Sequence, residues 1–370
     1  MSSINSNQKS LFASAAVFAV ALATTGQAVA QNGGVITDGD ASSVFDDADK
    51  ISIEDFIGAV QIATHNGPME ARAIGVSEAF PIRMVSKDGT LYVAGLSQLD
   101  MRKINREFWK RGRGREFDSR MEGFLSDYPS IKILAPVGSD LGITDSVVSA
   151  RAGNLGGSLI VGGGIISAEI GDVAAADIGI DGAGDVLVGS VEDDLLVRVN
   201  GSGDVAAISA GTANIKINGS GDVEIGDIAG DTQIAISGSG DVDFGDVTGD
   251  IKIGVSGSGD VDGGDVEGGM SASVNGSGDI EISSISGNTS VVISGNGDID
   301  IADGRAENLN VKIAGSGDFN LDGVSTNLVA YVGGNGVVSV SANEGSLKTS
   351  GDGDVYVGGQ KKSKARKKYK

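Results

Sequence analysis

One short motif, Gly-Xaa-Gly-Asp, returns at an almost constant interval from about residue 180 onward. Successive copies up to residue 318 are separated by 18 to 20 residues. Self-similarity at a fixed period of this length is typical of proteins built from stacked structural repeats. Degenerate copies at 162–165 and 334–337 extend the same period. The complete motifs end at Asp185, Asp204, Asp222, Asp241, Asp260, Asp279, Asp298, Asp318 and Asp354.

Between the motifs, apolar and polar residues alternate, as in Ile234 and Ile236 before one motif and Val242 and Phe244 after it. Alternation at period two in such brief runs predicts short strands with one face turned inward. A meander of hairpins would need paired turns and a two-strand repeat, so the simpler arrangement makes each repeat one coil of a parallel β-helix. We therefore predict an all-β fold, a single-stranded parallel β-helix (β-solenoid) of about ten coils with 18–20 residues per coil, an irregular N-terminal cap and a short helical basic insert.

The composition fits narrow coils. Gly accounts for 60 of 370 residues and aromatic residues for only 4%, so a wide globular core is not expected. In this interpretation Gly238 and Gly240 adopt positive φ at a tight corner, and the Asp241 carboxylate accepts a hydrogen bond from an N–H of its own turn. The chain contains no Cys, which excludes disulfides and thiolate metal sites.

The first thirty residues have a different character. Lys9 precedes a mostly apolar run over 11–23, and Ala28-Val29-Ala30 offers small residues suited to signal peptidase. We therefore expect a signal peptide over 1–30, a linker over 31–50, and export to the periplasm, the cell surface or the extracellular space. The apolar run is shorter than the roughly 20 residues that span a bilayer, so we expect no transmembrane span after signal removal.

The repeated Gly-Ser-Gly-Asp-Val at 201–205, 219–223, 238–242 and 257–261 resembles the autotransporter adhesin head GIN domain family. The resemblance covers roughly residues 50 to 357. It implies a secreted or periplasmic β-helix with no established enzymatic activity, and the adhesin name rests on analogy of architecture. It brings no catalytic or ligand-binding residue that could be assigned to positions in this chain.

Residues 51–150 are expected to form a strand segment that caps the regular repeats of 151–359. A basic insert at 97–122 interrupts this segment. A helix from about 98 to 111 would place Met101, Ile104 and Phe108 near one face. A basic amphipathic helix favours a polyanion or a membrane surface, and the alternative is a solvated excursion folded against the acidic wall. The candidate contact residues are Arg102, Lys103, Arg106, Lys110, Arg111, Arg113 and Arg115.

Between residues 151 and 360 the chain carries 32 acidic and 7 basic residues, and the acids recur in columns. Stacked carboxylates about 4.8 Å apart repel one another by roughly 1 kcal/mol per pair in water. Ca²⁺ could offset this repulsion, because it accepts six to eight oxygen ligands. Alternatively each carboxylate is satisfied by its own turn and screened by salt. The candidate metal residues are the corner aspartates Asp204, Asp222, Asp241, Asp260, Asp279, Asp298 and Asp318.

A catalytic interpretation needs a place where one repeat departs from the others. A glycoside hydrolase requires two carboxylates at a set separation, and no repeat gathers acids, basic residues and aromatics in that way. The single histidine, His65, falls at an expected turn. We therefore expect no catalytic residue, and no cofactor apart from the Ca²⁺ considered above.

The sequence favours an exported, non-enzymatic β-solenoid that acts as a structural, adhesin-like or binding surface protein of the cell envelope. The alternatives are a polysaccharide-active β-helix enzyme and a Ca²⁺-stabilised binding module. The expected partners are envelope or extracellular polysaccharide, another anionic surface polymer or a protein, and not nucleic acid. The basic tail over 360–370 is expected to be disordered, because it has no apolar period.

Overall fold

The computed structural model describes residues 27–28, 33–96, 101–111 and 117–362. The chain divides into two units. The N-terminal unit extends to Leu196 and includes Asn200–Ile208, and the C-terminal unit comprises Val197–Val199 and the chain from Ser209 onward. Stacked parallel coils form a β-solenoid, which confirms the predicted fold class.

Two rows of strands make up the N-terminal unit. One row contains β2, β7, β8, β4 and the first part of β10, and the other contains β3, β6, β9, β5 and the second part of β10. The strands are β1 (Gln27–Ala28), β2 (Gly33–Ile36), β3 (Gly39–Phe45), β4 (Lys50–Glu54), β5 (Ile57–His65), β6 (Met69–Val76), β7 (Ile82–Lys87), β8 (Thr90–Gly95), β9 (Ser130–Pro136), β10 (Ser139–Ala152), β11 (Gly156–Ile170), β12 (Ala175–Ile180) and β13 (Ala183–Val199).

Within this unit the pairing changes from antiparallel to parallel along the row. The pairs β2–β7, β7–β8, β3–β6 and β6–β9 are antiparallel, whereas β10 pairs in parallel with β4, β5 and β11. Strand β10 turns a corner at Asp145, whose φ is 50°, so its two parts lie on opposite rows. The opening of the solenoid is therefore irregular, as predicted, and its irregularity consists of antiparallel pairs, of which β7–β8 is a hairpin.

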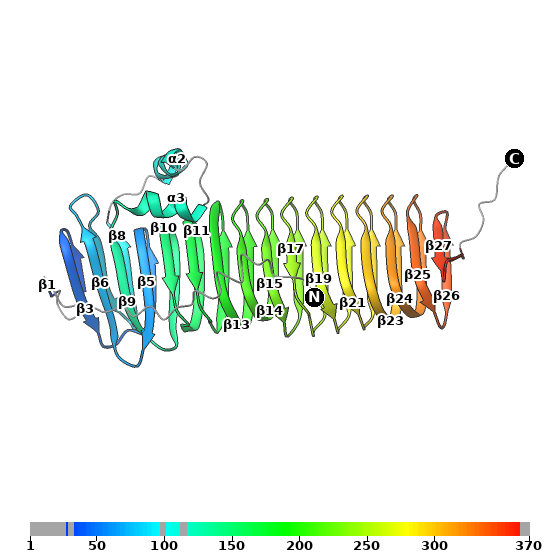
Figure 1. Ribbon diagram of the computed structural model, residues 1–370, viewed down its shortest axis with the longest axis horizontal. Coiled ribbons are helices and arrows are strands. Elements are labelled where there is room, and N and C mark those ends of the chain that lie inside the picture. Colours follow the sequence, from blue (N-terminus) through cyan, green and yellow to red (C-terminus); the bar gives the residue numbers. More distant parts are fainter. Residues whose placement is uncertain (1–26, 29–32, 97–100, 112–116, 363–370) are drawn as a thin grey trace. The chain divides into compact units, whose positions relative to one another are not determined.

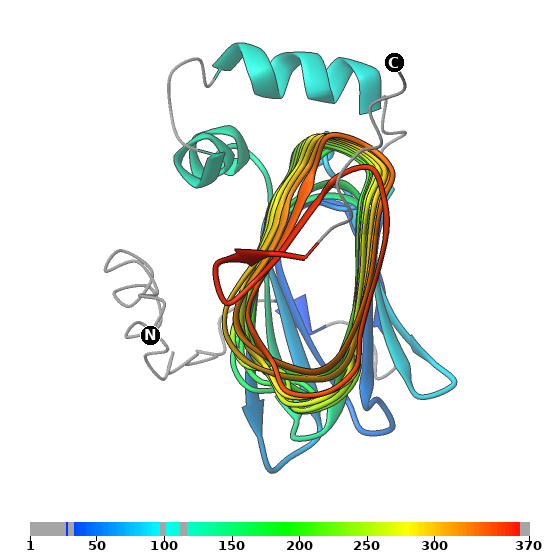
Figure 2. The same ribbon diagram turned by 90° about the vertical axis from the view of Figure 1, so that its right-hand side faces the viewer.

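Two helices leave the strands between β8 and β9 (Figure 1). These are α2 (Met101–Arg111), at the place where a helix is predicted, and α3 (Phe117–Leu125). Helix α3 packs against β5, β10 and β11, and α2 packs against α3 (Figure 2). Arg151 of β10 ties α3 to the strands, because its guanidinium lies 3.6 Å from Glu122 and 3.4 Å from Glu169.

The C-terminal unit repeats one coil with almost no variation. Strands of one side pair only with their equivalents, so Thr232 aligns with Ile251, Ile251 with Met270, and Met270 with Thr289. Its strands are β14 (Val205–Ile217), β15 (Val223–Ile228), β16 (Thr232–Ile236), β17 (Val242–Phe244), β18 (Ile251–Val255), β19 (Val261–Val266), β20 (Met270–Val274), β21 (Ile280–Ile285), β22 (Thr289–Ile293), β23 (Ile299–Ile313), β24 (Phe319–Val332), β25 (Val337–Asn343), β26 (Leu347–Gly351), β27 (Asp354–Val357) and β28 (Gln360–Lys361).

Each coil of this unit has two strand-bearing sides around a thin core. Seen end-on, the yellow to red coils superpose on one elongated outline (Figure 2). Burial alternates along each strand, as in β16 and β18, where every second residue is buried. The inward side chains are mostly Val and Ile, because the two sides leave little room between them.

The corner glycines are needed for a different reason from the one predicted. Neither Gly238 nor Gly240 has positive φ. Instead, a Cβ at Gly238 would collide with the carbonyl oxygen of Gly219, and that oxygen accepts a hydrogen bond from the N–H of Ser239 at 2.9 Å. The same contact recurs one coil later between Gly257 and Gly238. Glycine is needed here because successive backbones approach too closely for a side chain.

Other expectations concern boundaries. The described part of the chain forms about 12 coils, more than the ten expected, because coils also form before residue 151. Residues 33–36 and 39–45, expected within a linker, form β2 and β3. The expected signal peptide lies outside the described residues except for β1, and residues 363–370 of the expected tail also lie outside them.

Candidate binding surfaces

The corner aspartates of the C-terminal unit form a continuous hydrogen-bonded column. The Oδ1 atom of Asp241 accepts the backbone N–H of Asp260 at 2.8 Å, and Asp260 in turn accepts that of Asp279 at 2.8 Å. The column ends where Asp318 accepts the N–H of Val337 at 2.7 Å. We call this column the corner ladder; its members are Asp222, Asp241, Asp260, Asp279, Asp298 and Asp318.

This geometry corrects the expected partner of the corner carboxylates. Each carboxylate of the ladder accepts a backbone N–H of the next coil, because parallel stacking places that N–H beside it. An acceptor that carries a charge makes a stronger hydrogen bond than a neutral one, which offsets part of the repulsion within the column. Asp204 lies in the N-terminal unit, where its carbonyl oxygen accepts the N–H of Val186 at 2.9 Å.

A second column of acids lies on the neighbouring strands. Glu224, Asp243, Asp262, Glu281 and Asp300 align in direct register on β15, β17, β19, β21 and β23. We call the outward side of these strands the acidic face. Partial burial raises the pKa of the Asp243 carboxyl to about 6, and the carboxylates of Asp262 and Glu224 add to the shift. Burial likewise raises the pKa of Asp262 and of Asp300.

Two further columns repeat the corner ladder's chemistry. Asp246 donates its N–H to Asp227 at 3.1 Å and accepts that of Asp265 at 2.8 Å. The other column was not found by sequence reasoning, and in it Asp231 accepts the N–H of Asp250 at 2.9 Å. Asparagines replace aspartates further along it, and the Nδ2 atom of Asn308 donates to Asn288 at 2.8 Å. The available signal for this column was the spacing of 19 residues between Asp231 and Asp250, which equals the repeat period.

The opposite side of each coil differs in its side-chain chemistry from the acidic face. We call it the lysine face, the outward side of β14, β16, β18, β20, β22 and the second parts of β23 and β24. Gln233, Lys252, Ser271 and Ser290 align in one column of this face. Lys216 and Lys312 are exposed on the neighbouring column. The first column is thus polar in these four coils, whereas Ala235, Gly254, Ser273 and Val292 separate the two lysines of the second column.

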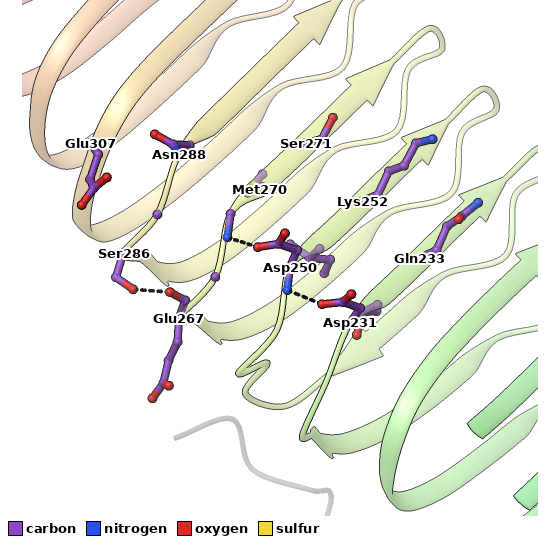
Figure 3. A pocket seen from close by; sticks show the side chains of 15 residues that line it. Asp231, Gln233, Asp250, Lys252, Glu267, Met270, Ser271, Ser286, Asn288 and Glu307 are labelled. Atoms are coloured by element: carbon purple, nitrogen blue, oxygen red, sulfur yellow. Dashed lines mark hydrogen bonds between the residues drawn. The ribbon is translucent and has the colours of Figure 1, made fainter. Parts of the chain in front are cut away.

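A shallow groove of about 640 Å³ lies beside the lysine face (Figure 3). It opens where Gly269 takes the place that Asp250 and Asn288 occupy in neighbouring coils, so a side chain is missing from the column. The N–H of Gly269 donates to Asp250 at 2.7 Å. The groove is lined by Asp231, Gln233, Asp250, Lys252, Glu267, Ser271, Asn288 and Glu307, with no aromatic residue among its lining residues.

The described residues provide no cluster of ligands for the Ca²⁺ considered above. Across the described residues, no group of three or more His, Cys, Asp or Glu side chains is arranged to hold a metal ion. One oxygen of each corner-ladder carboxylate already accepts a backbone N–H of the next coil. His65 ends β5, and its Nε2 atom lies 2.7 Å from the carbonyl oxygen of Pro68, which fits the turn role predicted for it.

The described part of the insert combines a buried apolar cluster with exposed cations on α2. Phe108 is fully buried in a cluster with Met121 and Phe124 of α3 and with Ile57, Val147 and Ile165 of the strands. An apolar core therefore holds the described part of the insert against the strands of the N-terminal unit. Among the candidate contact residues, Lys103, Arg106 and Lys110 are exposed on α2. Arg102 and Arg111 belong to α2, but their side chains lie outside the described part, as do Arg113 and Arg115 entirely.

In the described parts of the chain, no helix is long and apolar enough to cross a membrane. Among curated proteins, none matches the chain. A family model described as "Putative auto-transporter adhesin, head GIN domain" matches residues 160–263 and 263–361, more than half of the chain. These residues are the stacked coils, so the match and the fold support an adhesin-like, structural protein. The chain belongs to the auto-transporter adhesin head GIN domain family.

Proposed function

We propose that the chain is exported and acts, without catalysis, as an adhesin-like binding surface of the cell envelope. Its lysine face contacts an acidic polysaccharide or another anionic surface polymer. The observation that carries this proposal is the register of the lysine face, in which outward polar side chains recur in columns from coil to coil. Side chains that follow one another at about 4.8 Å along a column can contact a polymer lying along it at many successive points.

The chemistry of the two sides favours the lysine face for this contact. The acidic face would repel an anionic polymer, since its carboxylates stack in direct register. On the lysine face Lys216, Lys252 and Lys312 supply positive charge, and Gln233 and Ser271 supply groups that bond to hydroxyls. Each contact is weak, but linked contacts raise the overall affinity through effective concentration.

The insert supplies a second anionic contact in this proposal. Lys103, Arg106 and Lys110 extend into solvent from α2. Salt should weaken both contacts, because exposed charges are screened beyond about 8 Å at physiological ionic strength. A protein partner would contact the same polar columns of the lysine face.

A polysaccharide-active enzyme has less support. The groove beside the lysine face holds four carboxylates and Lys252 but no aromatic side chain on which a sugar ring could stack. Its carboxylates Asp231 and Asp250 already accept backbone N–H groups of the next coil. These bonds suit a role in holding coils together.

Deleting a whole repeat shortens the solenoid by one coil and keeps the register of the coils on either side. Deleting residues 232–250 removes one coil and joins Asp231 to Ile251, the register partner of Thr232. Binding to immobilised lipopolysaccharide should fall several-fold with one coil deleted and further with 232–269 deleted, because avidity depends on the number of linked contacts. Circular dichroism would check that the shortened chains fold.

Two triple variants, one on the lysine face and one on the acidic face, test the role of charge in the same assay. Lys216→Gln, Lys252→Gln and Lys312→Gln together should abolish most of the binding, whereas Glu224→Gln, Asp262→Asn and Glu281→Gln on the acidic face should leave it equal or stronger. Folded deletion variants that bind like the parent, or equal losses in both triple variants, would overturn the proposal.

A further inference from the structure

Helix α2 combines three cations with an exposed indole ring. Lys103, Arg106 and Lys110 follow one another at spacings of three and four residues, which places them on one side of the helix. All three are exposed. Trp109 lies between Arg106 and Lys110 at the edge of this side, with 44% of its surface exposed. We call these four residues the α2 patch.

The indole ring is held in position from its inner side. The guanidinium of Arg120, on α3, lies 4.3 Å from the centre of the Trp109 ring, within the range of a cation–π contact. The buried Phe108 ring meets the indole edge-on, with centroids 5.4 Å apart and planes at 80°. The exposed part of the ring is therefore oriented by its neighbours.

The helix cannot turn the α2 patch inward. Phe108 is fully buried and Ile104 packs against the same cluster, so rotation would expose that apolar face. Lys110 lies 3.6 Å from Glu107, but 70% of its side chain is exposed. An ion pair this exposed is weak, so Lys110 keeps its charge available to an external partner.

We infer that α2 docks on the surface of an anionic phospholipid bilayer, with the three cations facing the phosphate groups and Trp109 at the interface. This inference rests on the proposed envelope function and names the partner of the insert. Positive charge identifies an anionic partner. A convex helix with a projecting indole fits a flat surface with an apolar interior better than a polymer strand, and Trp is enriched where membranes meet water.

The contact is peripheral and reversible. The apolar face of α2 is committed to Phe124 and Met121 of the insert's core, so among the described side chains of α2 the indole is the apolar group that can enter the interface. Electrostatic attraction supplies the rest and falls off within a Debye length of the surface.

The chain contains a single Trp, so its fluorescence reports on the α2 patch alone. Protein purified from the exported fraction would be titrated with vesicles of phosphatidylglycerol and phosphatidylcholine in equal parts. The emission should shift to shorter wavelength and acrylamide should quench it less. Pure phosphatidylcholine vesicles should produce no shift, and about 1 M salt, which reduces the Debye length to roughly 3 Å, should abolish it.

Variants with equal charge changes test the assignment. Lys103→Gln, Arg106→Gln and Lys110→Gln together should weaken vesicle binding about a hundredfold, taking about fivefold for each cation near the surface. Lys50→Gln, Arg83→Gln and Lys87→Gln, at exposed positions elsewhere in the N-terminal unit, should leave it within about twofold. Trp109→Phe, followed by vesicle sedimentation, should weaken binding several-fold.

Three results would overturn the inference: no spectral shift with anionic vesicles at low salt, an equal shift with neutral vesicles, or equal losses in the two triple variants. A shift with heparin but not with vesicles would assign the α2 patch to a polymer; it would leave the proposed function standing and reject the bilayer. Loss of lipopolysaccharide binding through the lysine face is measured separately, so failure of the one does not imply failure of the other.

Discussion

The two units bury apolar surface in different ways. Of the fully buried Phe and Met side chains in the described part of the chain, seven lie in the N-terminal unit and only Phe319 lies in the C-terminal unit. The N-terminal unit concentrates stability in large side chains such as Phe108 and Met121, whereas the C-terminal unit spreads it over many equal contacts between backbones. A repeat therefore depends on the fit of its main chain, and an irregular unit on the fit of a few side chains.

The largest expected effect tests the backbone fit of the C-terminal unit. Gly257→Ala should lower the free energy of unfolding by about 4 kcal/mol or prevent folding, because its Cβ would collide with the carbonyl oxygen of Gly238. Gly254→Ala is the control: the nearest atom to its Cβ is the carbonyl oxygen of Ile234 at 3.9 Å, so the variant should be as stable as the parent or up to about 1 kcal/mol more stable. Urea unfolding measures both. Equal stabilities would contradict the close approach of the coils.

Next in size is a test of the side-chain core in the N-terminal unit. Phe108→Ala should destabilise the insert by about 3 kcal/mol, since it leaves a cavity among Met121, Phe124 and Ile165. Hydrogen exchange should show faster opening of α2 and α3, with the coils from 232 onward unaffected. Faster exchange throughout both units would show that they are not energetically separate.

A smaller effect separates hydrogen bonding from charge in the corner ladder. Asp260→Ala removes the acceptor of the Asp279 N–H and should cost about 1–2 kcal/mol. Asp260→Asn keeps an oxygen acceptor and removes a repelling charge, so its stability should equal or exceed that of the parent. Thermal unfolding would rank the three proteins. If Asp260→Asn were as unstable as Asp260→Ala, the carboxylate charge itself would be required.

The smallest expected effect depends on pH. The pKa of Asp243 is raised to about 6 in the folded chain from an ordinary value near 4, so the folded state binds more protons between these values. Stability is therefore lost as the pH rises from about 4 through about 6. Asp243→Asn should stabilise the chain by less than about 1 kcal/mol at pH 8, because water screens this partly exposed group, and should make no difference at pH 4. Urea unfolding at the two pH values measures it, and a gain at pH 4 alone would reverse the sign.

Much of the C-terminal unit could be predicted because the same sequence pattern and the same contacts repeat in each coil. The period, the strands around Ile234 and Val242, and the corner column containing Asp241 all follow from spacing. The reason for the glycines could not be found in the same way, because close approach of Gly238 to Gly219 depends on stacking distance and not on local turn preference. The antiparallel strand pairs of the N-terminal unit and the contact between Trp109 and Arg120 were also missed, since they join residues with no repeated spacing.

Register between successive coils is the claim on which the columns and the proposed function of the lysine face depend. Because the chain has no native Cys, an engineered pair can be read without interference. Asp243 and Asp262 align directly in neighbouring coils, at a separation of about 4.8 Å that a disulfide can bridge, whereas Asp243 and Glu281 are two coils apart. Mild oxidation of the folded protein should join Asp243→Cys to Asp262→Cys rapidly and should leave Asp243→Cys and Glu281→Cys as free thiols. Equal rates for the two pairs, or faster joining of the distant one, would contradict the stacking.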